Sequence, residues 1–387
     1  MREKSVIPYG KHFIDQEDSR SVLDVLRSDW ITQGPKIEEF EQAIADYCGA
    51  KYAVATCNGT AALHLSCLAA GLKSGDEAIT TPITFIATAN AILYVGAEPV
   101  FADIDYETGN ISPRSIEQTI SKKTKALLPV HFAGLPADLK EISQLAKKQH
   151  LWVIEDASHA LGAEYQGRKI GSCQYSDMTI FSFHPVKHVT TGEGGCVTTN
   201  NVEIYRKLKA LRGHGVYKNE KMKKKHGGWF YEMRDLGFNY RITDFQCALG
   251  ISQLKKIDKF LMHRRRIATK YNEGFANLKN KVRLPTDHFK DRLHAWHLYP
   301  FRLWTSQSKI TRRALYDELS AQGIHVQVHY IPVYFQPYYK RIVSHSPVRC
   351  QNAGRFYNEV LSLPIFPGLS DFEIHRVIRA VKTALEP

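Results

Sequence analysis

Long apolar runs are missing from this 387-residue sequence, which nowhere reaches the roughly 18 consecutive apolar residues that a membrane-spanning helix needs. Its first residues, MREKSVIPYGKHFIDQED, also lack the apolar stretch of a secretory signal. The seven cysteines are scattered and never spaced as C-x-x-C, which disfavours both a disulfide framework and a zinc site. We therefore expect a soluble, cytoplasmic protein with no membrane segment and no metal centre.

Acidic residues are the scarcer charged class: 39 Asp and Glu stand against 52 Lys and Arg, which gives a net charge of +13. Such an excess can indicate nucleic-acid binding, and the basic clusters at 218–225 and Arg264–Arg266 are the candidates. Lysine-rich stretches are more often solvated surface, and Ile267 and Tyr271 occupy one face of the helix expected around the three arginines. No nucleic-acid-binding motif accompanies either cluster, so we expect no nucleic-acid partner.

Short β-rich runs alternate with helical segments over the first 260 residues. Strands are expected at 52–56, 77–80, 125–130, 151–156, 178–183 and 195–200, with helices at 60–72, 85–96 and 139–150. This alternation predicts an α/β fold with a largely parallel sheet covered by helices. Ligands bind such sheets at the carboxyl ends of the strands.

The rest of the chain changes character. One long helix or two helices in series are expected over 242–275, and beyond them strands at 297–304 and 325–333 and helices at 311–323 and 372–385. These elements predict a smaller α+β domain. We therefore expect a large domain over 1–260, with an N-terminal arm over about 1–30, and a small C-terminal domain over 261–387.

A strand-to-helix junction, YAVATCNGTAALHL, places Asn58, Gly59 and Thr60 at the start of a helix. Free N–H groups at a helix N-terminus bind anions, a glycine lets a phosphate approach, and a threonine adds a hydroxyl donor. A plain helix cap without a ligand explains the same residues. Phe85, in PITFIATANAI after the next strand, is either a core aromatic or a ring that stacks on a planar ligand.

The run LWVIEDASHALGA ends an apolar strand in Asp156, with His159 three residues later. A carboxylate at that position can pair with a protonated ring nitrogen, and an imidazole can donate to the same ring or stack on it. The alternative for Asp156 is a structural cap.

A third run, DMTIFSFHPVKHVTTGEGG, brings Ser182 to the end of a strand and Lys187 into a turn, because Pro185 cannot join a sheet ladder. A lysine in a loop is usually a solvated charge. Lys187 is flanked by apolar residues, however, and desolvation would lower its pKa and expose an amine nucleophile.

Together these residues are a phosphate cradle, a carboxylate for a ring nitrogen, an amine and a stacking aromatic, which are the parts that pyridoxal 5′-phosphate (PLP) requires. Asp156 and Lys187 lie on different strands, so their proximity depends on the fold.

Six motifs, in chain order, resemble the sugar aminotransferases of the DegT/DnrJ/EryC1/StrS family: NGTAAL, TPITFIATANAI, VIEDASHALGAEYQGRKIGS, FSFHPVKHVTTGEGG, LRGHGV and GFNYRITDFQCALGISQL. The resemblance extends from ITQGPKIEEFE near the start to LSLPIFPGLSD near the end. It implies the fold type I of PLP-dependent transferases, that of aspartate aminotransferase, with PLP as the cofactor.

The resemblance also implies roles for individual residues. Lys187 would carry the cofactor as an internal aldimine and act as the catalytic acid and base, while Asp156 would pair with the pyridine nitrogen. His159 matches a position, commonly Gln or His, on the hydroxyl side of the ring. The other implied cofactor contacts are Gly59, Thr60 and Ser182 on the phosphate, Phe85 stacked on the ring, and Asn239 on the phosphate of the neighbouring subunit.

Partners and substrates follow from the same resemblance. A homodimer with composite active sites is implied, and Arg241, His329 and Tyr330 are candidate contacts for a substrate carboxylate or nucleotide phosphates. Within the family, the sequence is most similar to the transaminases of pseudaminic acid biosynthesis. These move an amino group, usually from L-glutamate, to C4 of a UDP-linked 4-keto-6-deoxy-N-acetylhexosamine in a ping-pong reaction.

Three alternatives stay open. The chain could aminate another UDP- or dTDP-4-ketosugar. It could be a dehydratase, although relatives with that activity carry His at the lysine position and a histidine cannot form the imine. It could also be a basic nucleic-acid-binding regulator with an aminotransferase-like body, although the resemblance begins within the first forty residues and leaves no room for an added winged helix.

Overall fold

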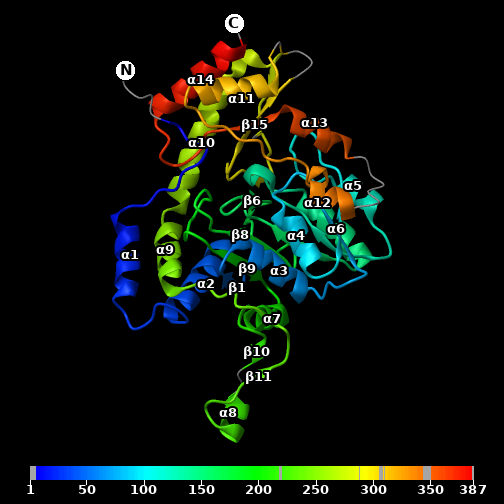
Figure 1. The fold of residues 1–387 in the computed structure, drawn as a ribbon, viewed down its shortest axis with the longest axis vertical. Coiled ribbons are helices and arrows are strands. Elements are labelled where there is room, and N and C mark those ends of the chain that lie inside the picture. Colours follow the sequence, from blue (N-terminus) through cyan, green and yellow to red (C-terminus); the bar gives the residue numbers. More distant parts are fainter. Residues whose placement is uncertain are drawn as a thin grey trace.

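A seven-stranded sheet forms the centre of the protein, whose computed structural model describes residues 6–217, 220–286, 288–304, 308, 310–342 and 350–385 (Figure 1). Across the sheet the strands run in the order β1 (Tyr52–Thr56), β9 (Gly195–Thr199), β8 (Met178–Ser182), β5 (Trp152–Asp156), β4 (Thr124–Leu128), β2 (Glu77–Thr80) and β3 (Glu98–Phe101). Neighbouring strands pair in parallel from β8 to β3, whereas β9 runs antiparallel to both β1 and β8. The predicted α/β fold with a mostly parallel sheet is confirmed.

Both faces of the sheet are buried, because successive side chains of one strand enter different hydrophobic cores. On β8, Phe181 packs with Phe40 in one core, while its neighbour Ile180 packs with Leu63 in the other. The helices around the seven-stranded sheet include α2 (Pro35–Cys48), α3 (Gly59–Ala69), α4 (Ala87–Tyr94), α5 (Pro113–Thr119), α6 (Leu139–Gln149) and α7 (Val202–Arg212).

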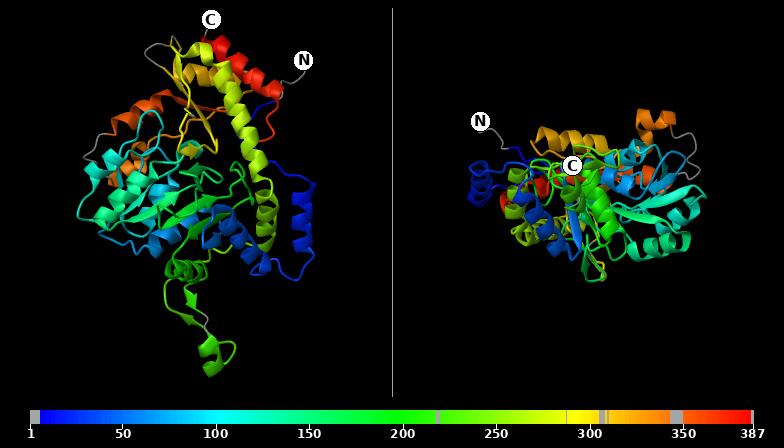
Figure 2. Two further views of the ribbon diagram at one scale, coloured as in Figure 1. Left: turned by 180° about the vertical axis from the view of Figure 1, so that it is seen from behind. Right: turned by 90° about the horizontal axis from the view of Figure 1, so that it is seen from below.

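Two helices in series, α9 (Asp244–Leu254) and α10 (Ile257–Gly274), lead from the sheet to the C-terminal part (Figures 1 and 2). Helix α1 (Gln16–Leu26) lies beside α9, where Asp18 is buried and accepts hydrogen bonds from Ser252 and Gln253. Tyr271 on α10 packs into the hydrophobic core of the C-terminal part, so this helix joins the two parts of the molecule.

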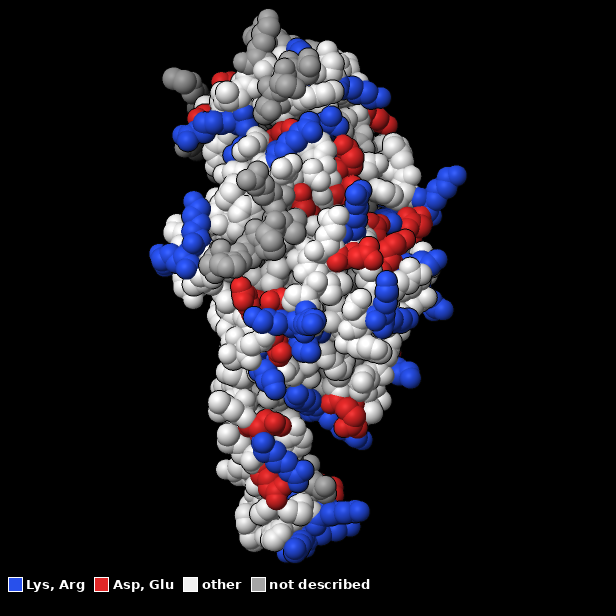
Figure 3. Space-filling model, turned by 90° about the vertical axis from the view of Figure 1, so that its right-hand side faces the viewer, with Lys and Arg blue, Asp and Glu red and all other residues white. Residues whose placement is uncertain are grey.

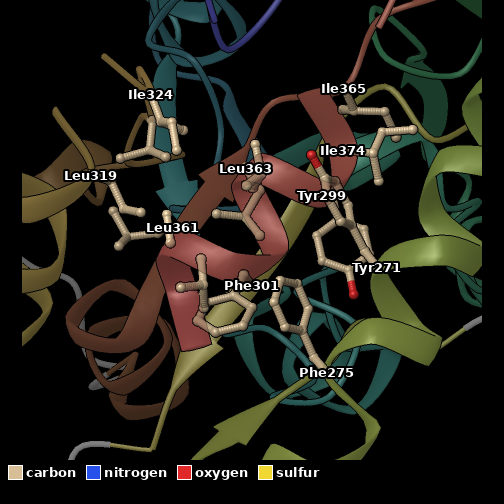
Figure 4. Packing of buried hydrophobic residues seen from close by; sticks show 14 of the residues in the cluster. Tyr271, Phe275, Tyr299, Phe301, Leu319, Ile324, Leu361, Leu363, Ile365 and Ile374 are labelled. Atoms are coloured by element: carbon tan, nitrogen blue, oxygen red, sulfur yellow. The ribbon is translucent and has the colours of Figure 1, made fainter. Parts of the chain in front are cut away.

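The C-terminal part has its own core and an antiparallel sheet in the order β12 (Val282–Arg283), β14 (Tyr299–Leu303) and β15 (Val360–Leu363). Its helices include α11 (Arg312–Ala321), α12 (Pro337–Ile342), α13 (Gln351–Glu359) and α14 (Asp371–Leu385). Figure 4 shows the centre of this core, where Phe275 and Phe301 lie edge to face. Ile7, near the N-terminus, packs into the same core and pairs with Ile324, so part of the expected N-terminal arm lies in the smaller unit.

Two expectations about this part were wrong. Residues 325–333 form no strand; they are an irregular segment tied to β15 by a single bridge between Gln327 and Ser362. Arg264, expected on a solvated face, is buried and donates to the carbonyl oxygens of Trp296, His297 and Ile365. The carbonyl groups take the place of water around its charge.

An arm projects from the sheet domain at the end opposite the C-terminal part (Figures 1 and 2). It consists of the short hairpin β10 (Val216–Tyr217) and β11 (Glu232–Met233) with α8 (Glu220–His226) at its tip. Part of the basic cluster at 218–225 lies outside the described residues. A further small sheet joins β13 (Arg292–Leu293), β6 (Glu164–Tyr165) and β7 (Arg168–Lys169).

Basic and acidic side chains alternate over the face shown in Figure 3. Basic side chains gather at the tip of the arm. Many of the basic groups are paired, such as Lys270 and Arg266 with Asp371. In the described part of the chain, no helix combines the length and the apolar composition needed to cross a membrane.

Candidate active site

A cavity of about 680 Å³ opens where the carboxyl ends of the parallel strands meet the C-terminal part of the chain. Its size is that of pockets that hold a small molecule. The structure brings nine of the predicted site residues to this one cavity, from both parts of the molecule: Gly59, Thr60, Phe85, Asp156, His159, Ser182, Lys187, His329 and Tyr330.

The N-terminus of α3 forms the end of the cavity that is suited to an anion. The Asn58 side chain caps this helix by accepting from the N–H of Ala61 at 2.8 Å. The earlier N–H groups, those of Gly59 and Thr60, have no partner inside an α-helix and remain for a ligand. The cap and the anion site are therefore compatible features of one junction.

Two glycines allow this junction to form. A Cβ on Gly59 would lie 3.0 Å from Cβ of Ser182, on the neighbouring wall of the cavity. A Cβ on Gly195 of β9 would lie 2.4 Å from the Asn58 carbonyl oxygen. The GEGG sequence thus lets β9 pass directly beneath the start of α3.

Asp156 ends β5 and is buried, with three hydrogen bonds to its carboxylate. Thr88 donates its hydroxyl to Oδ2 at 2.7 Å, and Ser158 donates its N–H and hydroxyl to Oδ1 at 3.1 and 2.6 Å. Thr84 lies 2.9 Å from the Thr88 hydroxyl and can donate to it in turn. These donors hold the carboxylate in a fixed orientation.

Removing the Thr88 hydroxyl tests this arrangement. Hydrogen bonds to charged groups contribute about 1.5–3 kcal/mol, so Thr88→Val is expected to weaken PLP binding by about ten- to a hundredfold. Equilibrium dialysis of the cofactor-free protein measures this change. Thr119→Val is the matched control, because it removes a hydroxyl bonded to Ser115 on α5. Equal affinities for the two variants would contradict the assignment.

Lys187 follows β8 in a turn closed by a hydrogen bond from its own N–H to the His184 carbonyl. Burial of the ammonium group lowers the pKa of Lys187 from 10.5 to about 8, although the nearby Asp156 carboxylate opposes this shift. Near neutral pH a useful fraction of the amine is therefore unprotonated and nucleophilic.

This lowered pKa predicts the pH dependence of Lys187 modification in the cofactor-free protein. A small neutral acylating reagent reacts only with the unprotonated amine, so its rate should rise with pH and level off above about 8. Asp156→Asn removes the charge that raises the pKa of Lys187, so the midpoint should move to lower pH. Peptide mass spectrometry measures the rates, with exposed Lys148 as the internal reference. A midpoint at the ordinary value of 10.5 would contradict the burial.

His159 lies beside Lys187 and Asp156 with its ring buried. Burial and the positive charge of Lys187 hold the pKa of His159 well below its usual value, so the ring is neutral. Its Nε2 lies 3.1 Å from the Tyr330 hydroxyl, while its Nδ1 has no hydrogen-bonding partner among the described residues.

The remaining predicted residues differ in their exposure and in whether they line the cavity. Phe85 is 59% exposed at the cavity, which excludes the core alternative and leaves its ring accessible to a ligand. His329 lines the cavity, lies 2.8 Å from the Ser362 hydroxyl through Nδ1, and has its pKa lowered to about 3 by burial. Asn239 and Arg241 lie outside this cavity; Arg241 lines a separate hollow at the base of the arm.

Sequence reasoning missed several residues at the cavity. Thr88 and Ser158 hold Asp156, and Tyr9 and Gln327 contribute side chains from distant parts of the chain. Thr88 could have been predicted at the cavity, because it follows Phe85 by about one helical turn and so shares its face. Tyr9 gave none, because only the fold brings the N-terminal segment to the site.

The family of the chain follows from comparisons with known proteins. The DegT/DnrJ/EryC1/StrS aminotransferase family profile matches residues 12–382. The UDP-4-amino-4,6-dideoxy-N-acetyl-beta-L-altrosamine transaminase of Campylobacter jejuni serotype O:23/36 is 42% identical over 363 residues, which are 93% of this chain and 92% of that protein.

Solved structures are also similar. An aminotransferase of Helicobacter pylori involved in the biosynthesis of pseudoaminic acid matches with a TM-score of 0.91 and 34% identity over 99% of this chain and all of the other. A putative sugar aminotransferase of Streptococcus pneumoniae, solved in its PLP form, matches with a TM-score of 0.90 and 30% identity over 99% of each chain. The chain belongs to the DegT/DnrJ/EryC1/StrS aminotransferase family, and its cofactor is PLP.

Proposed function

We propose that this protein transfers an amino group from L-glutamate to C4 of a UDP-4-keto-6-deoxy-N-acetylhexosamine, as a step of pseudaminic acid biosynthesis in the cytoplasm. The observation that carries the proposal is the convergence of Lys187 and Asp156 on one cavity beside the N-terminus of α3. The choice of sugar is supported by the names of the relatives from Campylobacter and Helicobacter. The seven free thiols suit a reducing compartment.

The residues of the cavity fit PLP. The start of α3 offers N–H groups to a phosphate, and the missing Cβ of Gly59 leaves room beside Ser182. Asp156 offers a buried carboxylate to a protonated ring nitrogen, and His159 has a buried Nδ1 without a partner in the described chain. Each polar part of the cofactor thus has a matching group on the wall of the cavity.

When bound, PLP supplies an electron sink that stabilises negative charge on the carbon next to the transferred amino group. The protein supplies the remaining chemistry. Lys187, with its pKa near 8, takes a proton from one carbon and returns it to another as a general base and acid. Asp156 keeps the ring nitrogen protonated, and the donors on Thr88 and Ser158 keep Asp156 in place.

A lysine at position 187 favours amino transfer over dehydration. A primary amine can hold the cofactor covalently and be displaced by the amino donor, whereas an imidazole serves as a base without forming an imine. Burial lowers the pKa of Lys187, so its amine can both attack the cofactor and transfer a proton near neutral pH.

The cavity of a single chain is poor in positive charge. Among its described lining residues there is no arginine, and burial keeps His159 and His329 neutral. A UDP-sugar carries two phosphates, which proteins bind with cationic side chains and N–H groups. We therefore expect further cations to come from a second copy of the chain.

The arm is the candidate source of these cations. It carries Arg234 and a lysine-rich helix, and it exposes large apolar side chains, among them Trp229 at 81% and Leu236 at 77%. Exposed apolar groups of this kind mark contact surfaces. Asn239 and Arg241 follow at the base of the arm. We expect a homodimer in which these residues complete the cavity of the partner.

Mixing two inactive variants tests the composite site. Lys187→Ala and Asn239→Asp should each be inactive alone, the second because its carboxylate repels the cofactor phosphate. After denaturation and refolding together they should regain about a quarter of wild-type activity, because half of the dimers are hybrids and each has one intact site of two. Light scattering gives the oligomeric state. No recovery from mixed dimers would contradict the shared site.

The substrate is tested by offering L-glutamate with a set of UDP- and dTDP-linked ketosugars and identifying the products by mass spectrometry. The proposal predicts a UDP-4-amino-4,6-dideoxysugar together with 2-oxoglutarate. An aminated dTDP-sugar alone would place the protein with the other ketosugar aminotransferases of the family. A deoxygenated or unsaturated sugar without 2-oxoglutarate would overturn amino transfer.

A further inference from the structure

One hydrogen bond joins the cofactor side of the cavity to its opposite wall. His159 follows β5 in the large part of the molecule, and Tyr330 belongs to the segment beside β15 in the C-terminal part. The Tyr330 hydroxyl lies 3.1 Å from His159 Nε2, and the two rings are nearly parallel at 19°. Both side chains line the cavity.

Counting protons on this pair limits the hydrogen bond to two directions, from the phenol to Nε2 or from Nε2 to the phenol oxygen. His159 is neutral and so carries one N–H, because burial and Lys187 hold its pKa well below the usual value. Burial raises the pKa of Tyr330, so the phenol keeps its proton. Within the described chain, Nε2 of His159 is the hydrogen-bonding partner that the hydroxyl has. The hydroxyl uses its proton within the chain when the phenol donates and Nε2 accepts, and in that arrangement the imidazole proton lies on Nδ1.

A proton on Nδ1 has no acceptor among the residues that the structure describes. Nδ1 is buried and has no partner among the described residues, and the ring of His297, 4.3 Å away, makes no hydrogen bond to it in that part of the chain. An unsatisfied buried donor is costly unless a ligand satisfies it. The acceptor on PLP that suits an N–H is its phenolate oxygen, which stands next to the carbon that Lys187 attacks.

We propose that Tyr330 is a positioning residue: its hydroxyl holds the single ring proton of His159 on Nδ1, so that His159 donates to the phenolate oxygen of bound PLP. This assignment replaces substrate binding as the role of Tyr330. It rests on the proposed cofactor site and is independent of which sugar or amino donor the protein uses.

A double-mutant cycle separates this role from a structural one. Tyr330→Phe keeps the ring and removes the donor, so it should weaken PLP binding by about tenfold. In a His159→Gln background the side-chain amide brings its own N–H, whatever Tyr330 does, so adding Tyr330→Phe should change the affinity by less than about twofold. Tyr334→Phe is the control, because the Tyr334 hydroxyl donates to the Cys350 carbonyl.

Equal losses from Tyr330→Phe in both backgrounds would overturn the proposal, because they would show that the phenol acts independently of His159. A second readout needs no cofactor. Nitrogen-15 NMR of histidine-labelled, cofactor-free protein should show His159 protonated at Nδ1, with the signal assigned by its loss in His159→Gln. Protonation at Nε2 would also overturn the proposal. Neither readout involves a sugar, so a wrong substrate assignment would leave both results interpretable.

Discussion

Replacing Lys187 by alanine is expected to lower the rate of amino transfer by about 10⁴-fold or more, since one change removes both the nucleophile and the group that moves the proton. The rate is measured as release of 2-oxoglutarate from L-glutamate in the presence of the ketosugar. The visible absorbance of the protein should shift as well, because PLP would then be held only by noncovalent contacts. Lys148→Ala, on the exposed surface of α6, should change neither property.

A second replacement tells which property of Lys187 matters. Lys187→Arg keeps a positive charge in the cavity, but a guanidinium is protonated throughout the working pH range and is no nucleophile. We expect this variant to be as inactive as Lys187→Ala. Substantial activity in Lys187→Arg would mean that position 187 supplies charge alone, and the catalytic assignment would be wrong.

Asp156→Asn is expected to lower the turnover number by about 10²- to 10⁴-fold, because breaking a buried charge pair costs about 3–5 kcal/mol. Without the carboxylate the ring nitrogen loses its proton, and the ring withdraws electrons less strongly. Asparagine has nearly the same shape, and Thr88 and Ser158 can still bond its amide, so the fold should persist.

The control for this change is Asp177→Asn. Asp177 precedes β8, at the amino ends of the strands, where it accepts from the N–H of Val153. It is also a partly buried carboxylate, but it lies away from the cavity. Activity should survive this substitution. A similar loss of turnover in both variants would show that general destabilisation explains the result for Asp156.

The strands that carry the site could be predicted because strands buried on both faces are continuous apolar runs. The runs ending at Asp156 and Ser182 were placed to within a residue, and both ends lie at the cavity. The reversed direction of β9 could not be predicted, since an apolar run reads the same in a parallel and in an antiparallel strand.

Contacts between distant segments set the limit of the sequence analysis. The pattern around Arg264 is that of a solvated helix face, and the three carbonyl groups that surround this side chain come from residues 32 to 101 positions away. The apolar residues of 325–333 alternate as in a strand, but the segment follows the wall of the cavity instead of a sheet edge. Local periodicity contains no information about either outcome.

The motif GFNYR shows a different limit. The sequence predicts Asn239 and Arg241 as site residues, and the structure of one chain places both outside the cavity. A motif records which residues matter and leaves open which copy of the chain uses them. We propose that these residues complete the site of a partner subunit, and the exposed arm next to them is the physical reason to look there.

The most direct test of the account is to run the two half-reactions separately. PLP-loaded protein mixed with L-glutamate alone should lose its visible absorbance and release one 2-oxoglutarate per active site. After removal of glutamate, the UDP-4-ketosugar should restore the absorbance and yield one aminated sugar per site. Restoration without an aminated sugar, or no change on adding glutamate, would contradict the proposal that Lys187, Asp156 and the end of α3 form a transaminase site.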